Sequence, residues 1–213
     1  MLPRAFYDRP TLDVAGDLIG KSLVHITPAG RTSGLIVEVE AYIGESDPAC
    51  HAAPGRTRRN APLYGQPGIA YVYFNYGMHW LVNAVTEPID SPAAVLIRAL
   101  EPEEGIGLMQ KRRARGSGKP AASFHVNGLC RGPGNLTKAL AIAGGENQLD
   151  LTSPRSALFI EVPRVERGFA IAWSPRIGIS VGTEQAWRCY VPGHPCVSGR
   201  IRPPVVAAAA ASR

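Results

Sequence analysis

Two glutamates on one predicted strand are the strongest candidates for catalysis in this chain. Residues 34–43 read GLIVEVEAYI, in which Glu38 and Glu40 alternate with valines, so both carboxylates should share one strand face. Tyr42 continues that face, and His51 follows in the next loop. A carboxylate held among apolar neighbours can act as a general base, with tyrosine and histidine as pocket walls or donors. The same alternation is also typical of a solvated strand face, so both interpretations stay open.

A metal site or a covalent nucleophile would be a different use of this segment. The potential metal ligands are Glu38, Glu40, Asp47 and His51, whose oxygen and imidazole donors suit magnesium, manganese or zinc. No HExxH motif or comparable fixed spacing supports such a site, and the GxSxG motif of serine hydrolases does not occur. We therefore expect neither a metal ion nor another cofactor.

A second group of residues that could bind a substrate lies in an aromatic segment. Residues 69–86, IAYVYFNYGMHWLVNAVT, are rich in aromatic and β-branched side chains around an Asn-Tyr-Gly turn, which predicts a β-hairpin. Tyr71 and Tyr73 fit ordinary cross-strand packing. Tyr76 lies at the turn, where its side chain should project outward and could act as a wedge or stacking platform for a nucleic-acid base. Asn83, among apolar neighbours, needs hydrogen-bond partners if it is buried, and a base edge is one candidate.

The charge balance favours an anionic partner. The chain has 213 residues, with 23 Lys and Arg against 17 Asp and Glu, and a formal net charge of +6. Basic side chains gather at residues 56–59 and 111–119, which makes nucleic acid the favoured anion. A basic surface that binds only solvent would have the same composition.

Composition also limits the domain organisation and the location. The 4 cysteines are widely spaced and form no CxxC pair, which argues against a zinc knuckle or a disulfide framework. No stretch approaches the roughly 18 to 20 apolar residues that a membrane span needs, and no secretory signal pattern precedes the domain. We expect one domain over residues 1–202, a disordered tail at 203–213, and a cytoplasmic protein, nucleoid-associated if bacterial.

The elements that must position these side chains follow from the sequence periods. Helices are predicted at residues 10–20, 102–115 and 135–143, with a Gly- and Ser-rich loop at 116–127. Besides the hairpin and residues 34–43, strands are predicted at residues 94–100, 158–162, 176–181 and 188–191. Because strands outnumber helices and do not alternate regularly with them, the pattern predicts an α+β domain around a mainly antiparallel sheet.

Several segments together resemble a known family. The segments VEVEAYIGESDPACHA, YVYFNYGMHWLVN, VLIRALEP, GPGNLTKALAI, RIGI and WRCYV occur in the order found in the alkyladenine or 3-methyladenine DNA glycosylases of the single-domain type without a helix-hairpin-helix. The resemblance covers residues 6–198. It implies a curved antiparallel sheet with flanking helices, similar to the C-terminal domain of methionyl-tRNA formyltransferase.

The resemblance also implies an activity and its residues. Such enzymes flip alkylated or deaminated purines, for example 3-methyladenine and hypoxanthine, out of double-stranded DNA and hydrolyse the N-glycosidic bond with activated water, without lyase activity. Glu40 matches the catalytic base, Arg98 a residue that holds the water, and Tyr76 the intercalating wedge. The matching base-pocket residues are Tyr42, His51, Tyr73 and Asn83, and those at the DNA backbone or groove are Thr57, Arg59 and Met78. Asn83 is expected to clash with the amino group of guanine.

Departures from the vertebrate pattern lie beside the wedge. Phe74 and Asn75 replace an aliphatic pair and His79 replaces an aromatic residue, which affects the expected lesion preference rather than the reaction. The main alternative is a non-catalytic nucleic-acid-binding module with the same fold, in which Glu40 is a surface residue. We expect a monomer that binds damaged DNA and no membrane.

Overall fold

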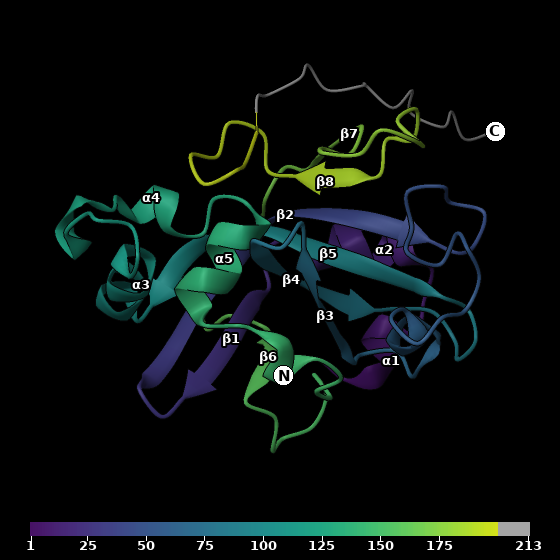
Figure 1. The fold of residues 1–213 in the computed structure, drawn as a ribbon, viewed down its shortest axis with the longest axis horizontal. Helices are drawn as coiled ribbons and strands as arrows, with labels where there is room; N and C mark the ends of the chain where they lie inside the picture. Colours follow the sequence, from purple (N-terminus) through teal and green to yellow (C-terminus); the bar gives the residue numbers. More distant parts are fainter. Residues whose placement is uncertain (200–213) are drawn as a thin grey trace.

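The computed structural model describes residues 1–199, which form a strongly curled antiparallel sheet with helices packed on it (Figure 1). The strand order is β3-β4-β5-β2-β1-β6, and β8 pairs with both β2 and β7. The strands are β1 Ser22–Thr27, β2 Gly30–Ile43, β3 Ala70–Asn75, β4 His79–Val85, β5 Ala93–Glu104, β6 Leu158–Glu161, β7 Ala172–Ser174 and β8 Arg188–Tyr190. All pairs between these strands are antiparallel, which confirms the predicted α+β class with a curved antiparallel sheet. The formyltransferase-like architecture stays a prediction.

Strand β2 is the axis of the sheet and is buried along most of its length. It pairs with β5 on one edge, while its other edge pairs first with β1 and then, from Glu38 to Glu40, with β8. The register with β5 shifts between Ile36 and Val39, and an irregularity of this kind bends a strand and increases its twist. The irregularity therefore lies in the part of β2 that carries Glu38 and Glu40.

Helices cover the sheet on both sides. The α-helices are α1 Arg4–Tyr7, α2 Thr11–Leu18, α3 Ile106–Ala114, α4 Val126–Leu129 and α5 Pro133–Leu140, and the short 3₁₀ turns are η1 Ala61–Tyr64, η2 Ala121–Ser123 and η3 Gly144–Glu146. In Figure 1, α2 lies behind the sheet and α5 in front of it. Val14, Ala15 and Leu18 of α2 are fully buried, as are Leu136 and Leu140 of α5, so each helix contributes an apolar face to the main core.

The hairpin and the helix near the N-terminus are confirmed, but the helix predicted at residues 102–115 begins later. Strand β5 continues to Glu104, so Glu103 and Glu104 belong to the sheet and not to the first helical turn. Glu103 accepts a hydrogen bond from Ser22, and Glu104 pairs with Arg31 at 2.7 Å. Gly105 follows the strand with a φ of 75°. This position requires glycine, because a Cβ there would lie 2.5 Å from the Arg31 carbonyl oxygen.

Other predicted elements differ more. The prediction of a strand at residues 176–181 is wrong, because this segment is irregular and the strand before it, β7, covers Ala172–Ser174. Strand β1 was not predicted, and the loop at 116–127 contains η2 and the start of α4. The predicted tail at 203–213 lies outside the described residues. Among residues 1–199, no helix has the length and apolar content needed to cross a lipid bilayer.

Candidate active site

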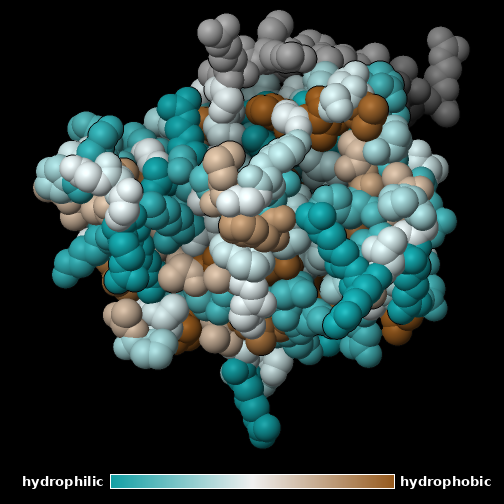
Figure 2. Space-filling model, in the orientation of Figure 1, coloured by the Kyte–Doolittle hydropathy of each residue, from teal (hydrophilic) through white to brown (hydrophobic). Residues whose placement is uncertain are grey.

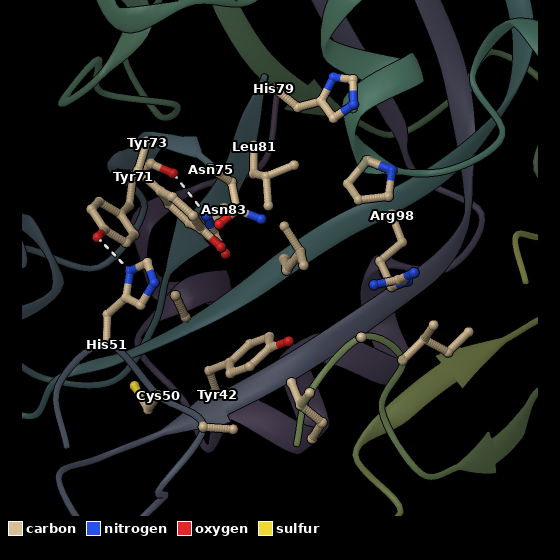
Figure 3. A pocket seen from close by; sticks show the side chains of 18 of the residues that line it. Tyr42, Cys50, His51, Tyr71, Tyr73, Asn75, His79, Leu81, Asn83 and Arg98 are labelled. Carbon is tan, nitrogen blue, oxygen red and sulfur yellow. Dashed lines mark hydrogen bonds between the residues drawn. The ribbon is translucent and has the colours of Figure 1, made fainter. Parts of the chain in front are cut away.

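A cavity of about 450 Å³ opens beside the ends of β2 and β5 (Figure 3). This size lies in the range of about 300 to 1,000 Å³ that is typical of small-molecule sites. The cavity is lined by Tyr42, Cys50, His51, Tyr71, Tyr73, Asn75, Tyr76, His79, Asn83, Arg98, the N-terminal residues of α5 from Gly132 to Asn135, and Ile177 to Ile179, together with several apolar side chains. The structure therefore brings the predicted pocket residues and Arg98 around one space.

Glu40 lies directly behind the wall of this cavity and is fully buried. Its Oε2 accepts hydrogen bonds from Tyr42 Oη and Arg98 Nη1, each at 3.0 Å, and its Oε1 accepts one from the backbone N–H of Ile177 at 2.6 Å. All three donors belong to residues that line the cavity. The interpretation of Glu38 and Glu40 as a solvated strand face is therefore wrong, since neither carboxylate reaches solvent.

Glu38 and Glu40 belong to a buried charge cluster that also contains Arg98 and Arg188. Arg98 donates through Nε to Glu38 and through Nη1 to Glu40, both at 3.0 Å. Desolvation lowers the pKa of Arg98, but the charges of Glu40 and Glu38 outweigh it and raise that pKa above its usual value. Arg98 therefore stays cationic beside the candidate base.

Tyr42 connects the charge cluster to the cavity. Burial, with the nearby Glu40 charge, raises the pKa of Tyr42, so its hydroxyl stays protonated and donates to the carboxylate. The Arg176 guanidinium carbon lies 4.7 Å from the centre of the Tyr42 ring, within the range of a cation–π contact. Arg176 is itself held by Asp47 through bonds of 2.6 and 2.8 Å. The ring that faces the cavity is therefore fixed in orientation.

The opposite wall is aromatic and polar. His51 and Tyr73 meet with ring centroids 4.4 Å apart, and a hydrogen bond of 2.8 Å joins His51 Nδ1 to Tyr71 Oη, as Figure 3 shows. Burial and the Arg59 charge lower the pKa of His51, so the imidazole is neutral at pH 7. Burial raises the pKa of Tyr71 to about 12. Asn83 is buried and donates to the Tyr71 carbonyl oxygen at 2.9 Å, which fixes its amide at the wall.

The hairpin tip, residues 74–79, lies at the mouth of the cavity. Tyr76 is 82% exposed, has a positive φ of 47°, and still lines the cavity rim. Met78 is 68% exposed. Such large apolar side chains at a turn have no packing role in the free protein, which agrees with the predicted outward position of Tyr76.

The two basic clusters differ in their surroundings. Thr57 and Arg59 are exposed, and Arg59 donates to the Phe74 carbonyl oxygen of the hairpin tip at 3.3 Å. In the other cluster, Arg112 donates to the Ala139 carbonyl oxygen and Arg113 to the Leu129 carbonyl oxygen, so both side chains serve the fold. Lys111 and Arg115 of this cluster are exposed. Figure 2 shows a mainly hydrophilic surface over α3.

The candidate metal ligands are already paired with protein groups. Glu38 and Glu40 bind arginines, Asp47 binds Arg176, and His51 binds Tyr71. Within residues 1–199, no three His, Cys, Asp or Glu side chains gather as a possible metal site.

Sequence reasoning missed several lining residues. Tyr71 shares the strand face of Tyr73 and Asn75, so the period-two pattern could have placed it in the pocket. By contrast, the α5 N-terminus and Ile177 reach the cavity only through tertiary packing, and no local pattern marks them.

Comparison with known proteins gives a consistent result. The family model for methylpurine-DNA glycosylase matches residues 5–195. The chain is 48% identical over 203 residues to a protein from Methanocella arvoryzae, which covers 94% of this chain and 96% of the relative. It is 45% identical over 205 residues to one from Burkholderia lata, with coverage of 94% and 92%. Both relatives carry the name "Putative 3-methyladenine DNA glycosylase".

Proposed function

Because the chain belongs to the methylpurine-DNA glycosylase family, and is therefore a DNA glycosylase of DNA repair, we propose that it flips damaged purines into the cavity and hydrolyses their N-glycosidic bond. The proposed lesions are 3-methyladenine, hypoxanthine and similar alkylated or deaminated purines. The observation that carries this proposal is the buried Glu40 carboxylate, held by three cavity-lining donors against an aromatic pocket.

The pocket walls suit a planar base. Tyr42 lies on one side, and the packed rings of His51 and Tyr73 lie on the other, so a purine between them would be stacked on both faces. Stacking of a base on an aromatic side chain contributes about 1 to 3 kcal/mol. The fixed Asn83 amide would then exclude guanine by a clash with its exocyclic amino group.

Glu40 has the properties of a base that activates water. A carboxylate has about four lone-pair sites, and here three are occupied by protein donors. The fourth would accept from a water molecule when the residues that separate Glu40 from the cavity, Tyr42, Arg98 and Ile177, move apart as the lesion base enters. A free glutamate has a pKa near 4.3, far below that of water, so Glu40 cannot hold a hydroxide before the reaction. Proton transfer to Glu40 therefore occurs late, as the water oxygen adds to the anomeric carbon.

The bond changes balance with water as the only co-reactant. The C–N bond breaks with its electron pair leaving on the base, through a sugar that resembles an oxocarbenium ion. The negative charge of Glu40 stabilises this cation, and the water oxygen forms the new bond to the anomeric carbon while one water proton passes to Glu40. A cationic alkylated base leaves as the neutral base, whereas hypoxanthine gains a proton from solvent as it leaves. Glu40 then returns its proton to solvent. No covalent enzyme intermediate forms, and the products are the free base and an abasic site, so we propose a monofunctional hydrolase.

The hairpin tip faces the DNA in this proposal. Unstacking a nucleotide costs a few kcal/mol and is easiest at damaged pairs. The exposed Tyr76 ring would fill the space that the flipped nucleotide leaves, and Met78, Thr57 and Arg59 would contact the groove or backbone. We propose that one copy of the chain suffices, because all of these residues come from one chain.

The test is a cleavage assay on duplex DNA with one hypoxanthine or 3-methyladenine. Incubation with the protein, followed by alkali, should cut the lesion strand at that nucleotide and leave an undamaged duplex intact, with or without EDTA. Glu40→Gln should bind the lesion duplex normally but excise about 10² to 10⁴ times more slowly. Near-normal excision by this variant would remove Glu40 from the mechanism, and breaks without alkali that EDTA abolishes would indicate a metal nuclease instead.

A further inference from the structure

We infer that Glu38 and Arg188 are positioning residues for the catalytic pair, and that their opposite charges set the pH range in which Glu40 can act as a base. This inference rests on the proposed function. In the sequence alone, Glu38 shares the candidate roles of Glu40, and no pattern marks Arg188.

The contacts form an unbroken chain of alternating charge. Arg188 Nε donates to Glu38 Oε1 at 2.7 Å, and Arg98 Nε donates to the same oxygen at 3.0 Å. Arg98 then donates through Nη1 to Glu40 Oε2 at 3.0 Å. The order is therefore Arg188, Glu38, Arg98, Glu40, with two positive and two negative groups.

Glu38 and Arg188 are also held by other groups of the fold. Ser198 donates its backbone N–H to Glu38 Oε2 at 2.7 Å and its hydroxyl to Glu38 Oε1 at 3.0 Å. Arg188 donates to Ser174 Oγ and to the Ser198 carbonyl oxygen, both at 3.1 Å, and its guanidinium lies 4.2 Å from the Tyr190 ring centre. Because these groups are buried, water cannot replace a missing partner, and each charge is felt strongly by the next.

Arg98 is the shared member of this chain. Its guanidinium forms ion pairs with both Glu38 and Glu40. The charge on Glu38 therefore changes the net electrostatic effect of this cluster on Glu40. Without the negative charge of Glu38, the ionised form of Glu40 would be favoured further, because a like charge disfavours ionisation. Without the positive charge of Arg188, Glu38 would compete more strongly for Arg98, and ionised Glu40 would be disfavoured.

The other titratable or charged groups near Glu40 are either neutral or paired. Tyr42 on β2 and Tyr73 on β3 have raised pKa values because of burial and the Glu40 charge, so both stay neutral. Arg176, in the segment that carries Ile177, is paired with Asp47. Arg176, which also interacts with the Glu40 charge, keeps its partner Asp47 in both charge variants, so only the series of Arg188, Glu38 and Arg98 changes around Glu40.

The experiment measures the excision rate under single-turnover conditions at pH 5 and pH 7 on a hypoxanthine duplex. Glu38→Gln should raise the ratio of the pH 5 rate to the pH 7 rate, and Arg188→Gln should lower it, because the two variants remove opposite charges from the series that ends at Glu40. The matched control is Glu161→Gln, which removes a charge paired with Arg31 at the far end of β2. Its ratio should equal that of the unmodified protein.

A milder variant keeps the test decisive if a charge change prevents folding. Ser198→Ala leaves all charges in place but removes the hydroxyl that lies between Arg98 Nη2, at 3.3 Å, and Glu38 Oε1. It should lower the maximal excision rate several-fold while lesion affinity and the pH ratio stay unchanged.

The outcomes separate this inference from the proposed function. If the unmodified protein excises hypoxanthine but both charge variants fold and keep its pH ratio, the inference is overturned and the glycosylase proposal stands. The same holds if the charge variants do not fold and Ser198→Ala excises at the unmodified rate. If the unmodified protein excises no lesion, the proposed function itself fails.

Discussion

The charge cluster and the hairpin tip are opposite solutions to placing functional residues around one cavity. In the cluster, Glu38 and Glu40 are fully buried and every carboxylate oxygen has a donor within 3.0 Å. In the tip, Tyr76 is 82% exposed on a backbone of positive φ. The cluster is organised before substrate arrives, whereas the tip gains its contacts from the partner. Groups that act on the bond are thus fixed by the fold, and groups that meet the DNA are left free.

The largest expected effect concerns the second buried ion pair, which fixes the segment that carries Ile177. Asp47→Asn removes one charge from the Asp47–Arg176 pair, whose side chains are 1% and 0% exposed. Breaking such a pair leaves an uncompensated buried charge and costs about 3 to 5 kcal/mol of the free energy of unfolding. Urea denaturation at pH 7 would measure it. A loss below about 1 kcal/mol would mean that this buried pair contributes no more than an exposed ion pair.

The next effect should appear at the hairpin tip and leave the fold unchanged. Tyr76→Ser removes the exposed ring, and lesion-duplex affinity should fall about 10-fold, because a stacking contact contributes about 1 to 3 kcal/mol. Fluorescence anisotropy would give the dissociation constant, and the melting temperature serves as control. Unchanged affinity would argue against a wedge.

The two basic clusters offer a matched pair of smaller effects. Arg59→Gln should weaken DNA binding a few-fold and reduce the slope of affinity against salt concentration by about one ion, as expected for one phosphate contact. Arg112→Gln should leave DNA binding unchanged and lower the melting temperature, because its side chain binds the Ala139 carbonyl oxygen. Salt titrations of both variants test this division, and equal salt slopes for the two would refute it.

The smallest effect is a pH dependence of stability from the pocket wall. Burial, with the Arg59 charge, lowers the pKa of folded His51 below the usual value of about 6.5. The stability contributed by the neutral ring is therefore fully present above pH 6.5 and is lost as the pH falls through the lower folded pKa. His51→Phe removes this titration, so its melting temperature should change less between pH 7.5 and pH 5.5. An identical change in both proteins would exclude His51 as its source.

The sequence by itself determined the hairpin, the strand that carries Glu38 and Glu40, and the outward position of Tyr76. These features depend on side-chain period and turn chemistry, which act between residues close in the chain. The ordered segments of the family resemblance also agree with the matched residues 5–195.

Only the tertiary structure decided the burial and partners of the carboxylates. Glu40 binds a backbone group 137 residues away, and Glu38 binds Ser198, 160 residues away. The alternation along β2 is the same whether its polar face meets solvent or arginines. The pattern does not include β8, which pairs with β2 and carries the Arg188 that binds Glu38. The wrong strand at 176–181 has the same cause, since that segment is held by the buried Arg176 side chain and not by a strand ladder.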